Sequence, residues 1–148
     1  MSYDDLAAVC RIEPTIYSHP WTPGNFRDSL DAGHSAWVME VAGEIAGYAL
    51  VMMVLDEAHL LNISVAGSLQ GQGLGRALLV HMIEVSRHHK AANMFLEVRV
   101  SNTKAIALYE SMGFCEIRSL TTTPNAITMN SASAAVTTVR PSTPLSGI

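Results

Sequence analysis

Charged residues and cysteines are both scarce in this sequence. Charged side chains make up 15% of the 148 residues, and the formal net charge is −4. Such a chain lacks the basic face that neutralises phosphates, so we expect no direct binding to nucleic acid. Cys10 and Cys115 are too few and too far apart for a disulfide framework or a zinc site. We expect both to be small buried side chains in a reducing compartment.

Long apolar runs and internal repeats are absent as well. No stretch of about 18 apolar residues occurs, so we expect no membrane-spanning helix. The first residues, Met1 to Asp5, are acidic where a signal peptide is basic, so we expect a cytoplasmic protein. Apolar residues nevertheless account for 49% of the chain, which is enough for one domain with a single core.

Hydrophobic periodicity predicts an alternation of helices and strands. Apolar residues three and four apart predict helices, and short β-rich runs bounded by turns predict strands. The predicted helices are 4–17, a short one capped by Thr22, one from Leu74 to about His89, and one from Ser101 or Asn102 to about Met112. The predicted strands are 36–41, 45–55, 59–65, 94–100 and 114–120. Two helices, an antiparallel meander and a β-α-β-α-β run together predict an α/β fold with a mixed sheet.

The glycine-rich loop Gln70–Arg76 is the strongest local signal. Glycines allow a tight backbone path, and the N–H groups of the following helix start form an anion site, which a pyrophosphate would suit. The alternative is a turn that merely starts a helix. A P-loop is excluded because no Gly-Lys-Ser/Thr follows. A dinucleotide fingerprint would need glycine in place of Arg76, although Glu97 stands where its ribose-binding acid would be. We also expect the loop to follow the meander without opening a β-α-β unit. Both features make NAD a less favoured ligand than other pyrophosphate compounds.

The spacing Gln70-x-x-Gly73-x-Gly75 resembles the Q/R-x-x-G-x-G/A pattern with which GNAT acetyltransferases hold the coenzyme A pyrophosphate. Further similar runs are 19–21, 62–65, 72–79, 96–99, 101–102 and 105–114. The likeness is to the family members that acetylate the N-terminal alanine of a small-subunit ribosomal protein, number eighteen. It covers residues 1–118, which we expect to form a GNAT domain with a mixed, mostly antiparallel sheet flanked by helices.

The resemblance implies acetyl-CoA as co-substrate, a ribosomal protein N-terminus as partner, and no metal; the histidines have no metal-binding spacing either. It implies that Val65 N–H polarises the thioester carbonyl, while an N-capping role for Asn102 stays compatible with a coenzyme contact. The implied coenzyme-binding residues are Ile63, Ser64, Val65, Gly71, Gln72, Gly73, Leu74, Gly75, Arg76 and Asn102.

By the same resemblance, Glu97 is the general base and Tyr109 the general acid. A peptide α-amine has a pKa of about 7.7–8.0, so a carboxylate must take its proton before attack, and a phenol can protonate the leaving thiolate. From spacing alone, Glu97 would be the solvent side of a half-buried strand and Tyr109 an ordinary core residue. No residue stands out as a nucleophile, which favours direct transfer.

The last thirty residues differ from the rest. From Ser119 onward there are 12 Ser or Thr residues and one charged residue, Arg140, so we expect an atypical, partly disordered segment over 119–148. Related sequences carry Arg-Asn-Tyr-Tyr-Pro near the peptide site. Codons for Asn-Tyr-Tyr-Pro read one base later give Thr-Thr-Thr-Pro, as found at 121–124, so we hypothesise a frameshift near Arg118. The alternative keeps 126–129 as a shortened last strand.

Three other functions stay open at this point. One is a coenzyme A-binding module that has lost catalysis with its acceptor site. Another is a GNAT acting on a lysine or a small amine, because coenzyme motifs do not select acceptors. A nucleotide-binding protein is the most distant of the three.

Overall fold

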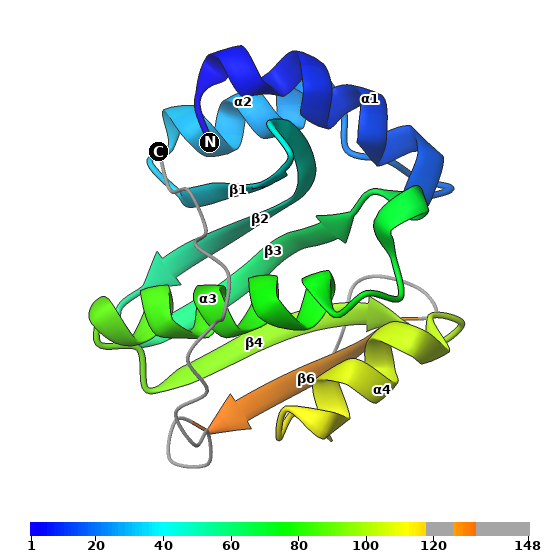
Figure 1. Ribbon diagram of the computed structural model, residues 1–148. Coiled ribbons are helices and arrows are strands. Elements are labelled where there is room, and N and C mark those ends of the chain that lie inside the picture. Colours follow the sequence, from blue (N-terminus) through cyan, green and yellow to red (C-terminus); the bar gives the residue numbers. More distant parts are fainter. Residues whose placement is uncertain (118–125, 133–148) are drawn as a thin grey trace.

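Six strands and four helices make up the fold in the residues that the computed structural model describes, 1–117 and 126–132 (Figure 1). The helices are α1 (Leu6–Ile16), α2 (Pro23–Asp31), α3 (Leu74–His88) and α4 (Thr103–Ser111), with 3-10 turns at Tyr3–Asp5 and Gly67–Leu69. The strands are β1 (Ser35–Val41), β2 (Glu44–Val54), β3 (Glu57–Val65), β4 (Asn93–Arg99), β5 (Cys115–Ile117) and β6 (Ala126–Ala132). They form one sheet in the order β1-β2-β3-β4-β6-β5. The predicted mixed sheet is confirmed.

Local side-chain signals set the starts of two helices. Thr22 Oγ accepts a hydrogen bond from Asn25 N (3.1 Å), and Asn25 Oδ1 accepts one from Thr22 N (2.9 Å). This reciprocal capping box, with Pro23 at the first helical position, begins α2 as predicted. Asn102 Oδ1 accepts from Ala105 N (3.2 Å), so Asn102 rather than Ser101 caps α4.

The β3-α3-β4 segment is a parallel crossover. β1, β2 and β3 pair antiparallel, whereas β3 and β4 pair parallel with α3 between them along the chain. The expectation that the glycine-rich loop would not open a β-α-β unit is therefore wrong. The helix predicted from Leu74 to about His89 already has the length that a parallel crossover needs, so the error lay in counting β3 only as the last strand of the meander. Arg76 at the third glycine position remains the argument against a dinucleotide fingerprint.

Helices cover the two faces of the sheet, and each contact forms a core. On one face, Val9 of α1 and Phe26 of α2 pack against Tyr48 and its neighbours on β1 and β2. On the other face, Leu79 of α3 and residues of α4 pack against β2, β3 and β4. Figure 1 shows the two helix pairs apart from each other, with α1 and α2 over the β1–β2 end.

β6 lies in the segment expected to be atypical, where the alternative placed a last strand. It pairs antiparallel with both β4 and β5. The proposed frameshift near Arg118, the predicted strand end at 118–120 and most of the predicted disorder fall outside the described residues. Met129 of β6 is fully buried in the core beside α3.

Two smaller findings concern the cysteines and the helix lengths. Cys10 is half-buried, and Cys115 is exposed, so the expectation of burial is wrong for Cys115, which lies on the edge strand β5. None of the helices in the described part of the chain is long and apolar enough to cross a membrane.

Candidate active site

A cleft begins where β3 and β4 stop pairing. The parallel ladder runs from Glu57 opposite Asn93 to Leu60 opposite Leu96, and ends there. Beyond that point β3 continues beside β2 and β4 continues beside β6. The two neighbouring strands thus separate in the middle of the sheet, and their facing edges become available to a ligand.

A β-bulge in β3 accompanies this separation. Leu60 lies opposite Val51 and Asn62 lies opposite Leu50, so Leu61 is the extra residue. A bulge bends its strand and increases the local twist, which turns β3 away from β4 at the point where the ladder ends. Leu61 packs with the α1–α2 core, and Asn62 bonds to a side chain of α1, so both face the same side.

The larger of two cavities in this cleft lies between the end of β3, the glycine-rich loop and the start of α4. Its volume is about 750 Å³, in the range of small-molecule sites. Arg99 and Lys104 add positive charge to its lining. The predicted coenzyme-binding residues that line it are Ile63, Ser64, Val65, Gly71, Gly75 and Asn102. The other predicted ones, Gln72, Gly73, Leu74 and Arg76, belong to the same loop and helix start but do not line this cavity.

The glycine-rich loop has the backbone of an anion site. Gly71 and Gly73 have φ of +80° and +81°, a left-handed conformation that favours glycine, and a Cβ at either would meet no atom within 4 Å. Gly73 is the N-cap of α3 and supplies no side chain, so the first N–H groups of the helix face outward with the positive end of its dipole. The Arg76 guanidinium points elsewhere: its Nη2 donates to Ser111 Oγ on α4 (2.7 Å).

Two backbone N–H groups of β3 point into the cleft. Ala66 N donates to Ala46 O on β2 (2.8 Å), and successive N–H groups along a strand alternate in direction. The N–H groups of Val65 and Ile63 therefore point away from β2. Their carbonyls face the same way, and Gln70 Nε2 donates to Val65 O (3.0 Å) while Tyr17 OH donates to Ile63 O (2.9 Å).

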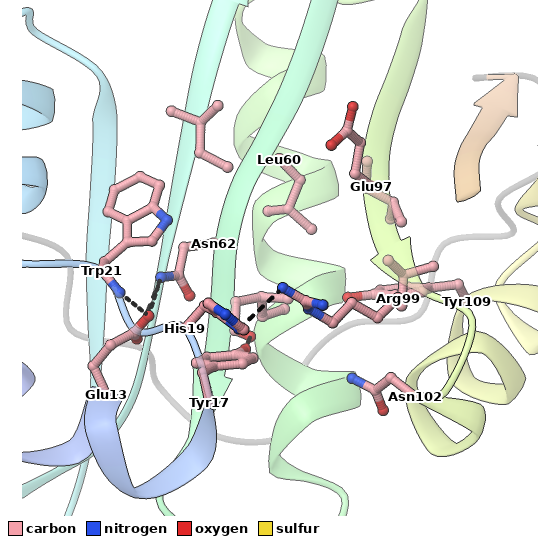
Figure 2. Close-up of a pocket in the computed structure, with 14 residues that line it drawn as sticks. Glu13, Tyr17, His19, Trp21, Leu60, Asn62, Glu97, Arg99, Asn102 and Tyr109 are labelled. Carbon is pink, nitrogen blue, oxygen red and sulfur yellow. Dashed lines mark hydrogen bonds between the residues drawn. The ribbon is translucent and has the colours of Figure 1, made fainter. Parts of the chain in front are cut away.

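The smaller cavity, about 210 Å³, contains both residues predicted to be catalytic (Figure 2). Glu97 is exposed on β4, between the buried Leu96 and Val98, and its side chain lines the cavity. Tyr109 reaches the cavity from α4 and is only 6% exposed. The interpretation of Glu97 from its spacing, the solvent side of a half-buried strand, is confirmed, and this outward face of β4 is also a wall of the cleft. Its role as general base stays a prediction.

Burial shifts the titration of Tyr109. Desolvation, reinforced by the nearby Tyr17, raises the pKa of Tyr109 above its usual value near 10. A phenol is protonated at neutral pH even without this shift, so the raised pKa extends the proton-donating form of Tyr109 to higher pH.

The two cavities share one wall. The residues that line both are Tyr17, His19, Ile63, Arg99, Asn102 and Tyr109. Arg99 Nη2 lies 3.4 Å from His19 Nδ1, which joins the end of β4 to the connection between α1 and α2 across the cleft. A molecule in the larger cavity and one in the smaller cavity would therefore meet at this wall.

Sequence reasoning missed three residues of the site. Glu13, Tyr17 and Asn62 line the smaller cavity and take part in hydrogen bonds across it. Glu13 lies four residues after Val9 and three before Ile16, so it is on the apolar face of α1. This spacing is the signal that could have identified Glu13 as a buried polar residue. Its partners Tyr48 and Asn62, which come from distant segments, could not be read from it.

Comparison with known proteins settles the family. Residues 6–114 match the model of the Acetyltransferase (GNAT) family. The chain belongs to the GNAT family. Its fold, resemblance and acetyltransferase activity are thereby as predicted, and enzymes of this family use acetyl-CoA.

Several relatives of this GNAT chain are named [Ribosomal protein bS18]-alanine N-acetyltransferase. The [Ribosomal protein bS18]-alanine N-acetyltransferase of Escherichia coli K12 is 43% identical over 112 residues, which is 76% of each chain. The crystal structure of the ribosomal-protein-S18-alanine N-acetyltransferase from Escherichia coli superimposes with a TM-score of 0.80 at 35% identity, over 98% of this chain and 96% of that one. Ard1 from Thermoplasma volcanium gives a TM-score of 0.81 at 27% identity, over 89% and 93%.

Proposed function

We propose that this GNAT enzyme transfers the acetyl group of acetyl-CoA to the α-amine of the N-terminal alanine of ribosomal protein bS18. The observation that carries the proposal is the pair of cavities meeting at a shared wall, with an anion-binding loop at one and Glu97 and Tyr109 at the other. The 43% identity to an enzyme of that name supports the choice of acceptor. Acting on a ribosomal protein, the enzyme works in the cytoplasm and contacts a protein N-terminus rather than nucleic acid or membrane.

The larger cavity fits acetyl-CoA in shape and charge. We assign the pyrophosphate to the N–H groups at the start of α3 and to the loop Gly71–Arg76, where the helix dipole favours an anion. The N–H groups of Ile63 and Val65 would pair with the pantetheine arm, as an added strand pairs with a sheet edge. Ser64 contributes mainly its side chain, because its backbone faces Tyr48 on β2.

The smaller cavity holds the groups that move protons. Acetyl-CoA supplies an activated thioester, and Val65 N–H would polarise its carbonyl. Glu97 takes the proton of the acceptor amine directly or through one water, and Tyr109 donates a proton to the leaving thiolate. Cys10 and Cys115 line neither cavity, which supports direct attack by the amine rather than a covalent enzyme intermediate.

Mass spectrometry of a peptide tests this function. A peptide with the alanine-initiated bS18 N-terminus, incubated with the enzyme and acetyl-CoA, should gain one acetyl group on its α-amine. The same peptide with a blocked N-terminus is the control and should stay unmodified. Acetylation of a lysine in the control would show that the acceptor is a lysine side chain. Acetylation of a free small amine in preference to the peptide would show that the acceptor is a small amine. No transfer by an enzyme that is folded and binds acetyl-CoA would favour a coenzyme-binding module without catalysis.

The GNAT domain of residues 1–118 and the atypical segment 119–148 remain our proposed division, with a frameshift near Arg118. Sequencing the gene across this codon tests the frameshift. An intact frame shared by close relatives would rule it out, whereas a single-base insertion or deletion would explain the Thr-Thr-Thr-Pro run.

A further inference from the structure

A glutamate is buried beside the acceptor cavity. Glu13 lies in the last turn of α1, is 1% exposed, and faces the sheet rather than solvent. Its Oε1 accepts from Trp21 N (3.1 Å) and from Asn62 Nδ2 (3.2 Å). Its Oε2 accepts from Tyr48 OH and from Asn62 Nδ2 (3.3 Å). Figure 2 shows the carboxylate between Trp21 and Asn62.

The Glu13 carboxylate is the acceptor in each of these hydrogen bonds. Burial and the hydrogen bond to Glu13 raise the pKa of Tyr48 far above its usual value, so the phenol stays a donor. Three donor groups, Trp21 N, Asn62 Nδ2 and Tyr48 OH, share the two carboxylate oxygens, which offsets the cost of burying the side chain. Since donors of the protein itself surround Glu13, we assign it no role as a second general base.

The hydrogen bonds of Glu13 hold the connection between α1 and α2. This connection, residues 17–22, is fixed at one end by Tyr17, whose OH donates to Ile63 O (2.9 Å). At the other end Trp21 N is fixed by Glu13, and the Trp21 ring packs on Phe26 at 5.1 Å between centroids. Tyr17 lines both cavities, whereas Glu13 and Trp21 line only the smaller one.

We propose that Glu13 is a positioning residue for the acceptor. By holding Trp21 against β3, it sets the width of the cavity that receives the first residue of the peptide, an inference that rests on the proposed function. Leu60 and Leu96 also line this cavity, so the first side chain of the peptide would meet apolar residues there. Glu13 acts through Trp21 and does not touch the reacting atoms.

Two substitutions of Glu13 test this role. Glu13→Met keeps the length of the side chain but removes both acceptors, and it should raise KM for the bS18 peptide about ten-fold. Glu13→Gln keeps one acceptor oxygen and should raise it about three-fold. In both variants KM for acetyl-CoA should stay within about two-fold, because the wall of the larger cavity is held separately by Tyr17.

Tyr48→Phe is the matched control. It removes one donor to Glu13 but leaves the bond to Trp21 N, so it should lower the melting temperature and leave KM for the peptide within about two-fold. If Glu13 contributed only to general stability, Tyr48→Phe and Glu13→Gln would instead change the peptide KM by similar amounts.

Fluorescence of Trp21 gives a readout that does not depend on activity. The chain has two tryptophans, so a Trp37→Phe background leaves Trp21 as the reporter. Glu13→Gln and Glu13→Met should shift its emission to the red and make it easier to quench with acrylamide. An unchanged emission together with an unchanged peptide KM in Glu13→Gln would overturn the proposal. If the parent enzyme did not acetylate the peptide, the fluorescence shift would still decide whether Glu13 holds Trp21.

Discussion

Glu97 lies directly opposite Thr128, so the part of β4 that carries the proposed general base pairs with β6 alone. The ladder with β3 ends one residue earlier, at Leu96. β6 in turn belongs to the stretch of unusual composition after Ser119. The position of the proposed catalytic carboxylate therefore depends on a segment outside residues 1–118, to which the sequence resemblance is confined.

Truncation after Asn125 should abolish acetylation and destabilise the protein. It removes the partner of Glu97, and loss of the fully buried Met129 side chain alone should cost about 1.5–3 kcal/mol. Thermal unfolding and peptide acetylation measure the two effects. Truncation after Ser133 retains β6 and is the control. Equal activity in both truncated proteins would show that β6 is dispensable.

Replacing Glu97 by Gln should slow transfer by about 100-fold or more, the usual loss when a general base is removed. Acetyl-CoA affinity should stay within about two-fold, because Glu97 lines only the smaller cavity. Steady-state rates and calorimetric binding separate the two effects. An unchanged rate would remove Glu97 from the proposed mechanism.

Tyr109→Phe should lower kcat by about 100-fold if the phenol protonates the leaving thiolate. Because burial raises the pKa of Tyr109 above 10, its acid form persists as the pH rises. The parent enzyme should therefore show no loss of kcat attributable to this phenol between about pH 8 and 9.5. Full activity of the variant would exclude the role, and a basic limb of the rate that disappears in the variant would contradict the raised pKa.

Gly73→Ala and Gly75→Ala should behave differently. The left-handed φ of Gly73 makes alanine there cost about 1–2 kcal/mol of stability, and the altered loop should weaken acetyl-CoA binding. Gly75 has ordinary helical geometry, and an added Cβ would lie 3.8 Å from Leu108 and Val65, in ordinary contact. Alanine at Gly75 should therefore leave stability unchanged or slightly raised, as the higher helix propensity of alanine favours, although its Cβ would project beside the cavity assigned to acetyl-CoA and should weaken binding. Denaturant unfolding measures the stability of both variants, and calorimetry measures their affinity for acetyl-CoA. An equal loss of stability in Gly73→Ala and Gly75→Ala would contradict the prediction.

The helices, strands and loop could be predicted because their signals are local. Thr22, Asn102 and Gly73 each act on the backbone within one helical turn, and their caps or turns are where the sequence placed them. The strands β1 to β3 are short runs rich in apolar residues and are joined by short turns, which makes their order visible from the chain.

The features that could not be predicted depend on contacts between distant segments. The spacing of α1 places Glu13 on its buried face, but two of its partners, Tyr48 and Asn62, lie 35 and 49 residues away and could not be predicted. The end of pairing at Leu60 and Leu96 likewise leaves no mark in either strand by itself. The roles of Glu97 and Tyr109 came from the family resemblance, and they stay predictions until the substitutions are made.

Leu61, the extra residue of the bulge in β3, reverses which side chains of the strand face which side of the sheet beyond it. Ala58 and Leu60 belong to the apolar core beside α3, and simple alternation would have sent Asn62 and Ser64 into the same core without partners. With the phase inverted, the amide and the hydroxyl face α1, while Ile63 packs on the apolar side. Deleting Leu61 would keep each side chain on its present face but remove the bend. β4 could then go on pairing past Leu96, giving a folded sheet with no space for either substrate.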